Sequence, residues 1–510
     1  MAGIFGEQDA FGEITCLGQG DGRMRQVTSR QGLRTPTLHS STGPAARASR
    51  LDRPLSGWWC ALGWLAATGV FFGLVLALGG ANPTDSPEST FTTLAIGHGQ
   101  LACAYPPGDA SALPALISPL YPLLAGAVEA VTGIGHTYAF PSQSALGPGC
   151  STAMQHALLY GSAAILRIGY LGWVALLAGL VALLRACGRG RCVWEPVTLL
   201  IVAALPSVLM TLTNAFHPQD MLAMGLALGG LAGARRGSWI WAGSLLGLAI
   251  TSQQFALLVL VPLLVIVPHN RRIRFAGAAA VAAAFVVVPL VVITSGRALR
   301  WAVLGSGTGA PDASTLIAKF PIHGPIVLES RMLPIALSIV LAWWAVRRLG
   351  PAVLEPIPLV SLVATSLGLR LVFEDHMLGY YPMAMVVSLV TLSVVRGRFS
   401  PYMVAWLGLV ALGYYPLPWG FSPLTYEIAP WVRQILILSS GIVLAVGPLT
   451  SAALATNPFR HFGGGTFLSP RRHEGTGSAL NDPHDGLALG LGDSGGRGSA
   501  GYLEQSPSGH

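Results

Sequence analysis

The shortage of charged residues is the feature that most constrains what this chain can fold into. Only 10% of its 510 residues are charged, whereas 52% are hydrophobic. Soluble domains carry roughly 25% charged residues, so a water-soluble surface of this size cannot be built here. Lipid must surround most of the chain. The sequence therefore predicts an all-α, polytopic integral membrane protein.

The charge balance excludes other classes of partner and site. The net charge is +8, and arginine supplies nearly all of the basic residues, because Lys319 is the only lysine. No basic run is interleaved with aromatic residues, so we expect no nucleic-acid partner. No Cys-x-x-Cys or Cys/His metal spacing occurs among the cysteines, so we expect no metal-binding residues.

Apolar runs long enough to cross a bilayer, which takes about 20 residues per helix, fill the middle of the chain. The stretch 238–268 is broken at 251–254, and we interpret it as two short or half-length helices. Counting these as two, the sequence predicts about twelve transmembrane or half-membrane helices. The expected spans are 57–81, 162–186, 196–213, 220–234, 238–268, 275–294, 332–346, 352–370, 378–395, 400–415 and 430–449.

Arginine positions give the expected orientation. Three arginines precede the first span, and neither Lys nor Arg occurs from residue 54 to 166. Later arginines cluster at alternate span ends. Under the positive-inside rule, both termini are cytoplasmic and one long loop, about 82–160, is external. We expect a multi-pass protein of the cell (plasma) membrane whose chemistry faces the extracytoplasmic side.

The two ends of the chain differ from its middle. Residues 1–55 and 453–510 are polar, rich in Gly and Ser, and lack apolar periodicity. We predict two disordered cytoplasmic tails around a transmembrane domain at 56–452.

Polar residues of the external loop form the first candidate group. Asp85 and Glu88 follow the outer end of the first span, and His98 lies further along. Cys103 and Cys150 share this loop, where a disulfide can persist; the alternative is two independent buried thiols.

Two further groups lie at outer span ends or at the broken span. His217 and Asp220 begin a returning helix, where Asp220 either serves function or only stabilises the helix start. Gln253 and Gln254 lie at the break, where their amides either bind a hydroxyl-rich ligand or only satisfy the freed backbone.

The last group follows the span 352–370. Arg370, Glu374, His376 and Tyr380 gather there. An Arg370–Glu374 ion pair is one interpretation. A phosphate held by Arg370 is the other, because a guanidinium fork matches phosphate geometry.

These residues resemble a known family. One external loop with acids, broken central helices and outer polar clusters resemble the C-type glycosyltransferases. More narrowly, residues 217–263 are similar to bacterial polyprenol-phosphate-mannose-dependent alpha-mannosyltransferases, whose pattern is His-Pro-Glu-Asp, an arginine turn, Ala-Gly-x-x-x-Gly-Leu-Ala and Thr-Lys-Gln. The corresponding segments of this chain are 217–220, 235–236, 242–249 and 252–254. Gln219 stands where the pattern has Glu, and Gln253 stands where it has Lys.

The resemblance implies an inverting transfer of mannose, or of another hexose or pentose, from a polyprenyl-phosphate donor to an envelope lipid or glycan acceptor. The base in such enzymes lies in the first external loop, which Asp85 and Glu88 both fit, with Asp85 preferred. His217 and Asp220 would support catalysis, and His98, Gln253, Gln254, Arg370, Glu374, His376 and Tyr380 would bind substrate. No cofactor is implied, and a divalent-cation requirement stays open.

Two other functional classes are alternatives to the glycosyltransferase interpretation. A transporter or flippase of an envelope lipid or sugar precursor also uses broken helices. Its polar residues would gather at the midplane, whereas these gather at outer span ends. A catalytically inactive scaffold is the third class.

Overall fold

The computed structural model describes residues 50–78, 86–97, 99, 118–132, 169–213, 216–293, 296, 331–374, 380–414 and 430–455. The chain divides into two units, Met1–Asn457 and Pro458–His510, and every described residue belongs to the first. Most of each predicted tail lies outside the described residues, and so do both Cys103 and Cys150. The disordered tails and the disulfide therefore stay predictions.

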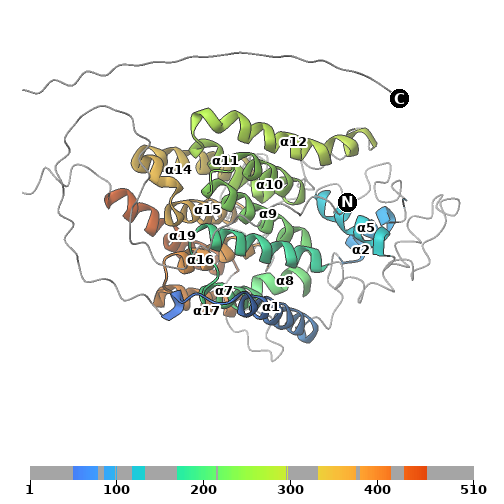
Figure 1. Cartoon of the computed structure of the whole chain (residues 1–510), viewed down its shortest axis with the longest axis horizontal. Coiled ribbons are helices and arrows are strands. Elements are labelled where there is room, and N and C mark those ends of the chain that lie inside the picture. The colour runs from blue at the N-terminus through green and yellow to red at the C-terminus, as the bar shows by residue number, and fades with distance from the viewer. Residues whose placement is uncertain are drawn as a thin grey trace, which may run out of the picture. The chain divides into compact units, whose positions relative to one another are not determined.

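The described part of the chain is helical and contains no strand (Figure 1). Among the described residues, five helices are long and apolar enough to cross a membrane. They are α1 (Gly57–Leu78), Gly169–Ala186, α12 (His269–Ile293), Leu333–Leu354, which contains α14 (Leu333–Leu349), and Ile435–Ala455, within α19 (Pro430–Ala455). The polytopic all-α prediction is confirmed.

Further helices lie at the other predicted spans. They are α9 (Pro218–Arg235), α10 (Trp239–Ser252), α11 (Leu257–Ile266), α15 (Pro356–Val372), α16 (Met383–Val395) and α17 (Pro401–Tyr414). The expected span 196–213 is instead a pair, α7 (Trp194–Ala203) and α8 (Pro206–Thr213), bent by 48°. Pro206 explains the bend, because proline cannot donate the backbone hydrogen bond that a continuous helix needs.

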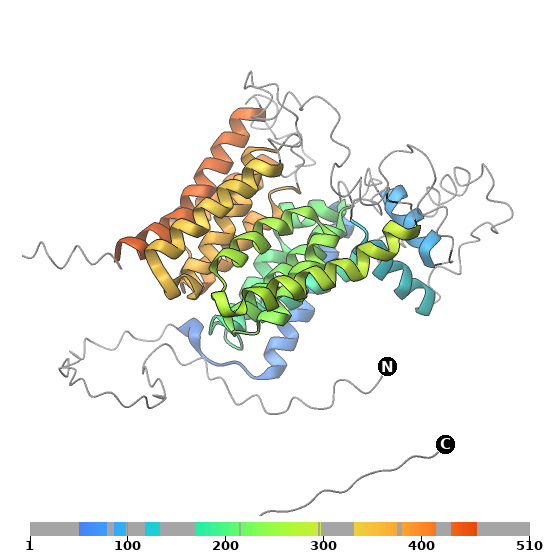
Figure 2. The same ribbon diagram turned by 90° about the horizontal axis from the view of Figure 1, so that it is seen from above.

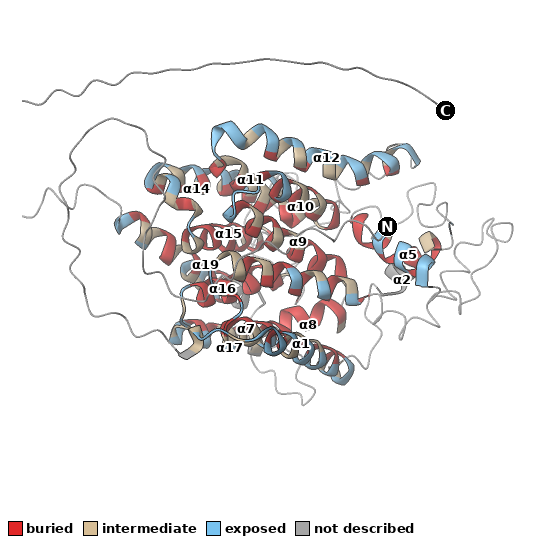
Figure 3. Cartoon of the chain, in the orientation of Figure 1, coloured by how far each residue is buried: buried red, intermediate tan, exposed pale blue. Residues whose placement is uncertain are grey.

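Burial separates central helices from lipid-facing ones (Figure 3). Every residue of α16 is buried, as are most of α9 and α15. By contrast, α12 exposes large apolar side chains, including Phe285 at 81% and Val292 at 73%. Such a surface is stable only in hydrocarbon, so α12 has the composition and exposure of a helix that lipid covers.

Glycines bring α10 and α12 into close contact (Figure 2). A Cβ atom built on Gly243 would lie 2.3 Å from the Phe275 carbonyl oxygen, and one on Gly247 would lie 2.2 Å from that of Ala279. These glycines are four residues apart, the spacing with which small residues form membrane helix interfaces. The Ala-Gly-x-x-x-Gly segment therefore joins two helices.

Gly247→Ala should lower the stability of the folded protein by about 1–3 kcal/mol, because the new methyl group meets backbone rather than a movable side chain. The matched control is Gly277→Ala on α12, where nothing lies within 4 Å of the added atom. There alanine should stabilise the helix, by up to about 1 kcal/mol. Thermal unfolding in detergent measures both, and equal shifts of the two variants would contradict the close contact.

Arginines collect at one end of the helices through direct contacts. The Arg189 side chain donates to the Val395 carbonyl oxygen at 3.4 Å, and Arg236 donates to that of Ala182 at 3.5 Å. Arg189 also pairs with Asp52 at 2.5 Å. The arginine-bearing ends of helices distant in sequence thus come together, and we call this the arginine end.

Candidate functional site

The start of α9 positions His217 and Asp220. Pro218 occupies the first turn of the helix, and the Asp220 amide donates to the His217 carbonyl oxygen at 3.0 Å. Phe216, before them, is fully buried with φ of 50°, a conformation uncommon for a non-glycine residue. Asp220 is 6% exposed. A carboxylate so deeply buried needs polar partners.

The break after α10 supplies one of those partners. Gln253 is extended, with φ of −160° and ψ of 136°, and it separates α10 from the short helix η4 (Gln254–Ala256). Its side-chain oxygen accepts from the Gln254 amide at 3.0 Å, so it does satisfy freed backbone. Its amide nitrogen also donates to Asp220 Oδ1 at 2.6 Å. The interpretation that Gln253 satisfies freed backbone thus finds its contact, whereas its binding of a hydroxyl-rich ligand stays a prediction.

The end of α15 brings a cation to the same place. Arg370 lies in the last turn, and its Nε lies 2.8 Å from Glu374 Oε2 in the ion pair that one interpretation predicted. Its guanidinium carbon also lies 5.7 Å from the Phe255 ring centre and 5.6 Å from that of Tyr381. Phe255 follows Gln254 directly, so the ends of α10 and α15 are adjacent.

Aromatic rings join α9 to the segment before α16. The His217 and Tyr380 rings stack with centroids 4.5 Å apart and planes at 19°. Tyr380 meets Tyr381 edge-to-face at 4.8 Å. The Gln219 amide nitrogen lies 2.8 Å from His217 Nδ1. If the amide donates, the proton of the neutral imidazole is on Nε2.

Opposite charges connect the Asp220 carboxylate of α9 with the Arg370 guanidinium of α15. Asp220 and Arg370 attract each other across the cluster, and Arg370 attracts Glu374 as well. Three groups that the sequence places far apart therefore form one polar cluster, which we call the Asp220–Arg370 cluster. Its members are His217, Gln219, Asp220, Ser252, Gln253, Arg370, Glu374, Tyr380 and Tyr381.

Several predicted site residues lie outside the described part of the chain: Asp85, His98, Cys103, Cys150 and His376. Glu88 falls in helix α2 (Ser86–Gly97), but its side chain is not described. α2 packs on α5 (Leu120–Thr132), which contacts both α9 and α10. The loop that carries the predicted base is therefore connected to the helices that carry Asp220 and Gln253.

Glu129 on α5 is a buried acid that our sequence analysis missed. It is 6% exposed, and burial raises the pKa of its carboxyl from 4.5 to about 7. A Cβ atom on Gly97 of α2 would lie 2.8 Å from Glu129 Oε2, so the carboxyl lies at the α2–α5 contact. The available signal was an acid within a 13-residue apolar helix.

The raised pKa predicts how the α2–α5 pair responds to pH. The folded state holds the Glu129 proton more tightly than the unfolded state, so stability is greatest below the ordinary value of 4.5 and falls as pH rises toward 7. Amide hydrogen exchange in α2 and α5, corrected for intrinsic rates, should be slower at about pH 5 than at about pH 8. Glu129→Gln should remove the difference; its persistence in that variant would exclude Glu129 as the cause.

Metal ligands are not grouped in the described part of the chain. No set of three or more His, Cys, Asp or Glu side chains is arranged there to hold a metal ion. The acids and histidine of the Asp220–Arg370 cluster contact amides, an aromatic ring and a guanidinium instead.

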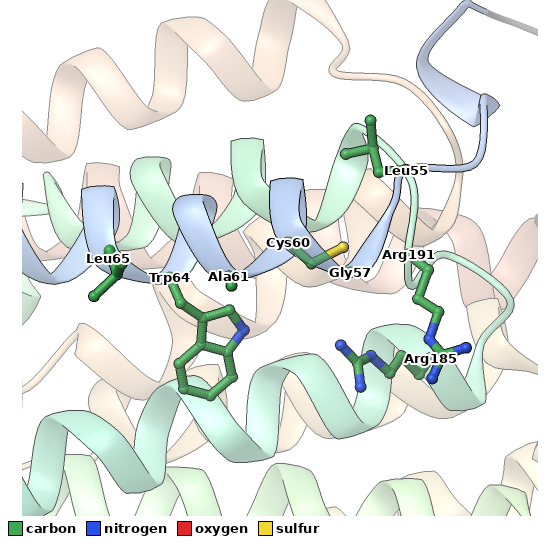
Figure 4. A pocket seen from close by; sticks show the side chains of 8 residues that line it. All are labelled: Leu55, Gly57, Cys60, Ala61, Trp64, Leu65, Arg185 and Arg191. Atoms are coloured by element: carbon green, nitrogen blue, oxygen red, sulfur yellow. The ribbon is translucent and has the colours of Figure 1, made fainter.

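A cavity of about 760 Å³ lies at the arginine end rather than at the Asp220–Arg370 cluster (Figure 4). It lies between the start of α1 and the end of Gly169–Ala186, and Arg185, Arg191 and Trp64 line it. Arg185 binds the fully buried Glu195 through two hydrogen bonds, at 3.2 and 2.9 Å. Its charge is therefore largely neutralised within the protein.

Comparison with known proteins finds one family model that is similar to the central helices. Residues 152–349 match the model described as Glycosyltransferase family 87. No curated protein and no solved structure matches the chain. The matched region includes His217, Asp220, Gln253 and Gln254, whereas Arg370, Glu374 and Tyr380 follow it. The expectation of a membrane glycosyltransferase is confirmed: residues 152–349 are similar to glycosyltransferase family 87, and the chain is a polytopic membrane glycosyltransferase.

Proposed function

We propose that the chain transfers a sugar from a polyprenyl-phosphate donor to an envelope lipid or glycan acceptor, with inversion, on the extracytoplasmic face of the plasma membrane. The observation that carries this proposal is the Asp220–Arg370 cluster. It combines a buried carboxylate, a guanidinium and stacked aromatic rings beside a helix break. The donor class, the sugar, the acceptor and the face are all parts of the proposal.

Arg370 is proposed to bind the donor phosphate. The family pattern has a lysine where this chain has Gln253, so a cation is missing at that position. Arg370 restores a positive charge nearby, because it interacts with Asp220, the hydrogen-bond partner of Gln253. A guanidinium suits a phosphate better than an ammonium does, since it can donate two parallel hydrogen bonds. As the phosphate enters, the ion pair with Glu374 would break, or Arg370 would contact both Glu374 and the phosphate.

The remaining residues of the cluster are proposed to bind the sugar. Asp220, Gln253 and Gln254 offer acceptors and donors for sugar hydroxyls, and the stacked His217–Tyr380 pair offers an apolar wall. His98 and His376 are proposed to belong to the same site. A sugar needs both kinds of surface, because its hydroxyls must be paired while its ring carbons are apolar.

Asp85 is proposed to be the general base, with Glu88 in reserve. Its carboxylate would take the proton of the acceptor hydroxyl as that oxygen forms a bond to the anomeric carbon. The bond from the anomeric carbon to the phosphate oxygen breaks at the same time, and polyprenyl phosphate leaves with the electron pair. Arg370 would stabilise the charge on the departing phosphate.

A transfer assay tests the function. Purified protein is incubated with polyprenyl phosphate carrying radiolabelled mannose and with an envelope lipid extract, with and without a chelator of divalent cations. The expected result is labelled product whose anomeric configuration is opposite to the donor's. Retained configuration would overturn the inverting mechanism. Movement of lipid or sugar across proteoliposomes with no transfer from any polyprenyl-phosphate sugar would overturn the proposed function.

A further inference from the structure

A second cationic groove lies on the lipid-facing side of the protein at the arginine end. Its volume is about 410 Å³. It is bounded by the end of α11, the first turn of α12 and the last turn of α14, and it is lined by Leu264, Val265, Arg272, Trp343, Val346 and Arg347. The Asp220–Arg370 cluster adjoins η4, before the start of α11, so the two sites are separated by the length of that helix.

The two arginines of this groove have no carboxylate partner in the described part of the chain. A terminal nitrogen of Arg272 donates to the Val265 carbonyl oxygen at 3.1 Å, while its buried Nε finds no hydrogen-bond acceptor among the described residues. The Arg347 guanidinium lies over the Trp343 ring at 4.7 Å. The groove thus differs from the cavity beside Arg185, where Glu195 supplies a counter-charge.

The walls of the groove are apolar and face outward. Trp343 is 52% exposed, and Ile273, next to Arg272, is 86% exposed. Only 17% of the membrane-spanning window of α12 and 28% of that of Leu333–Leu354 is buried inside the protein, so acyl chains would cover much of both in a bilayer. A ligand of this groove must therefore combine an anionic group for the two arginines with hydrocarbon for the walls.

We propose that this groove binds the headgroup phosphate of an anionic glycerophospholipid, with an acyl chain along Leu264, Val265 and Val346. A basic pocket between membrane helices suits such headgroups. The buried Arg272 Nε–H would gain an acceptor from the phosphate, and Arg347, held by Trp343, would close the other side. On the topology expected from the arginine positions, the groove opens to the cytoplasmic leaflet, away from the proposed donor site.

Native mass spectrometry with phosphatidylglycerol, and separately with zwitterionic phosphatidylcholine, tests the proposal. Wild-type protein should retain one phosphatidylglycerol preferentially. Arg272→Gln with Arg347→Gln should weaken that retention by about tenfold to thirtyfold, because each arginine near a phosphate contributes modestly. Arg347→Gln alone should weaken it by about fivefold; Arg347 is exposed, so this variant should fold even if the double variant does not.

The matched control is Arg271→Gln with Arg274→Gln. Both residues are exposed on the same turns of α12 as Arg272, and neither lines the groove. The control removes the same charge and should leave the retained phosphatidylglycerol in place. Equal loss in the two double variants would mean general surface attraction and would overturn the proposal. So would equal retention of phosphatidylcholine, or full displacement of the lipid by millimolar inorganic phosphate.

Discussion

Asp85→Asn is expected to lower sugar transfer by about two to four orders of magnitude, because it removes the group proposed to accept the proton. Asparagine keeps the size of the side chain. Asp85 directly precedes α2 in the sequence, and asparagine caps helix starts about as well as aspartate. The variant therefore separates proton transfer from any role in starting α2. Initial rates of transfer, at matched protein levels and matched thermal unfolding, measure the effect.

Two companion variants control this experiment. Glu88→Gln tests the reserve base, and it should reduce transfer less than Asp85→Asn does. Asp220→Asn keeps an oxygen that can accept from Gln253 but removes the negative charge at the start of α9. If Asp220 only supports the helix start, this variant should lower stability more than turnover. If Asp85→Asn and Glu88→Gln, singly and together, leave transfer unchanged, the base lies elsewhere in the chain.

The helices of the membrane domain could be predicted closely from the sequence. Both α1 and α9 begin within two residues of their predicted starts, and the break at Gln253 lies inside the predicted interruption. Apolar runs end where arginine or proline occurs, and these residues are explicit in the sequence. The bend before Pro206 was missed because apolar residues continue on both sides of it. The count of about twelve helices stays a prediction, as part of the chain is not described.

The composition of the candidate site could be predicted only in pieces. Sequence placed His217, Gln253 and Arg370 at ends of separate helices, but which ends are neighbours depends on the lateral order of the helices. That order is set by contacts such as Gly243 against Phe275, whose partner no local pattern reveals. The same reason explains why Glu129 was overlooked, because its burial arises only when α5 packs on α2.

Arg370→Gln is expected to lower the catalytic efficiency for the polyprenyl-phosphate donor by about two to three orders of magnitude, because it removes the proposed charge stabilisation of the leaving phosphate. Arg370→Lys should recover only part of the loss, since an ammonium cannot form the two parallel hydrogen bonds of a guanidinium. The loss should appear in both kcat and KM for the donor, and KM for the acceptor should change little. Steady-state kinetics with each substrate varied in turn measures the three values.

Glu374→Gln decides whether Arg370 acts on the substrate or only on the fold. Arg370 and Glu374 form one ion pair at 2.8 Å, so removing either partner breaks it. If the pair is merely structural, the two variants should lower transfer and thermal stability to the same extent. If Arg370 binds phosphate, Glu374→Gln leaves the guanidinium between Phe255 and Tyr381 and should retain most of the activity. The guanidinium would then be released from a competing carboxylate, so donor KM should fall or stay constant in Glu374→Gln while it rises in Arg370→Gln.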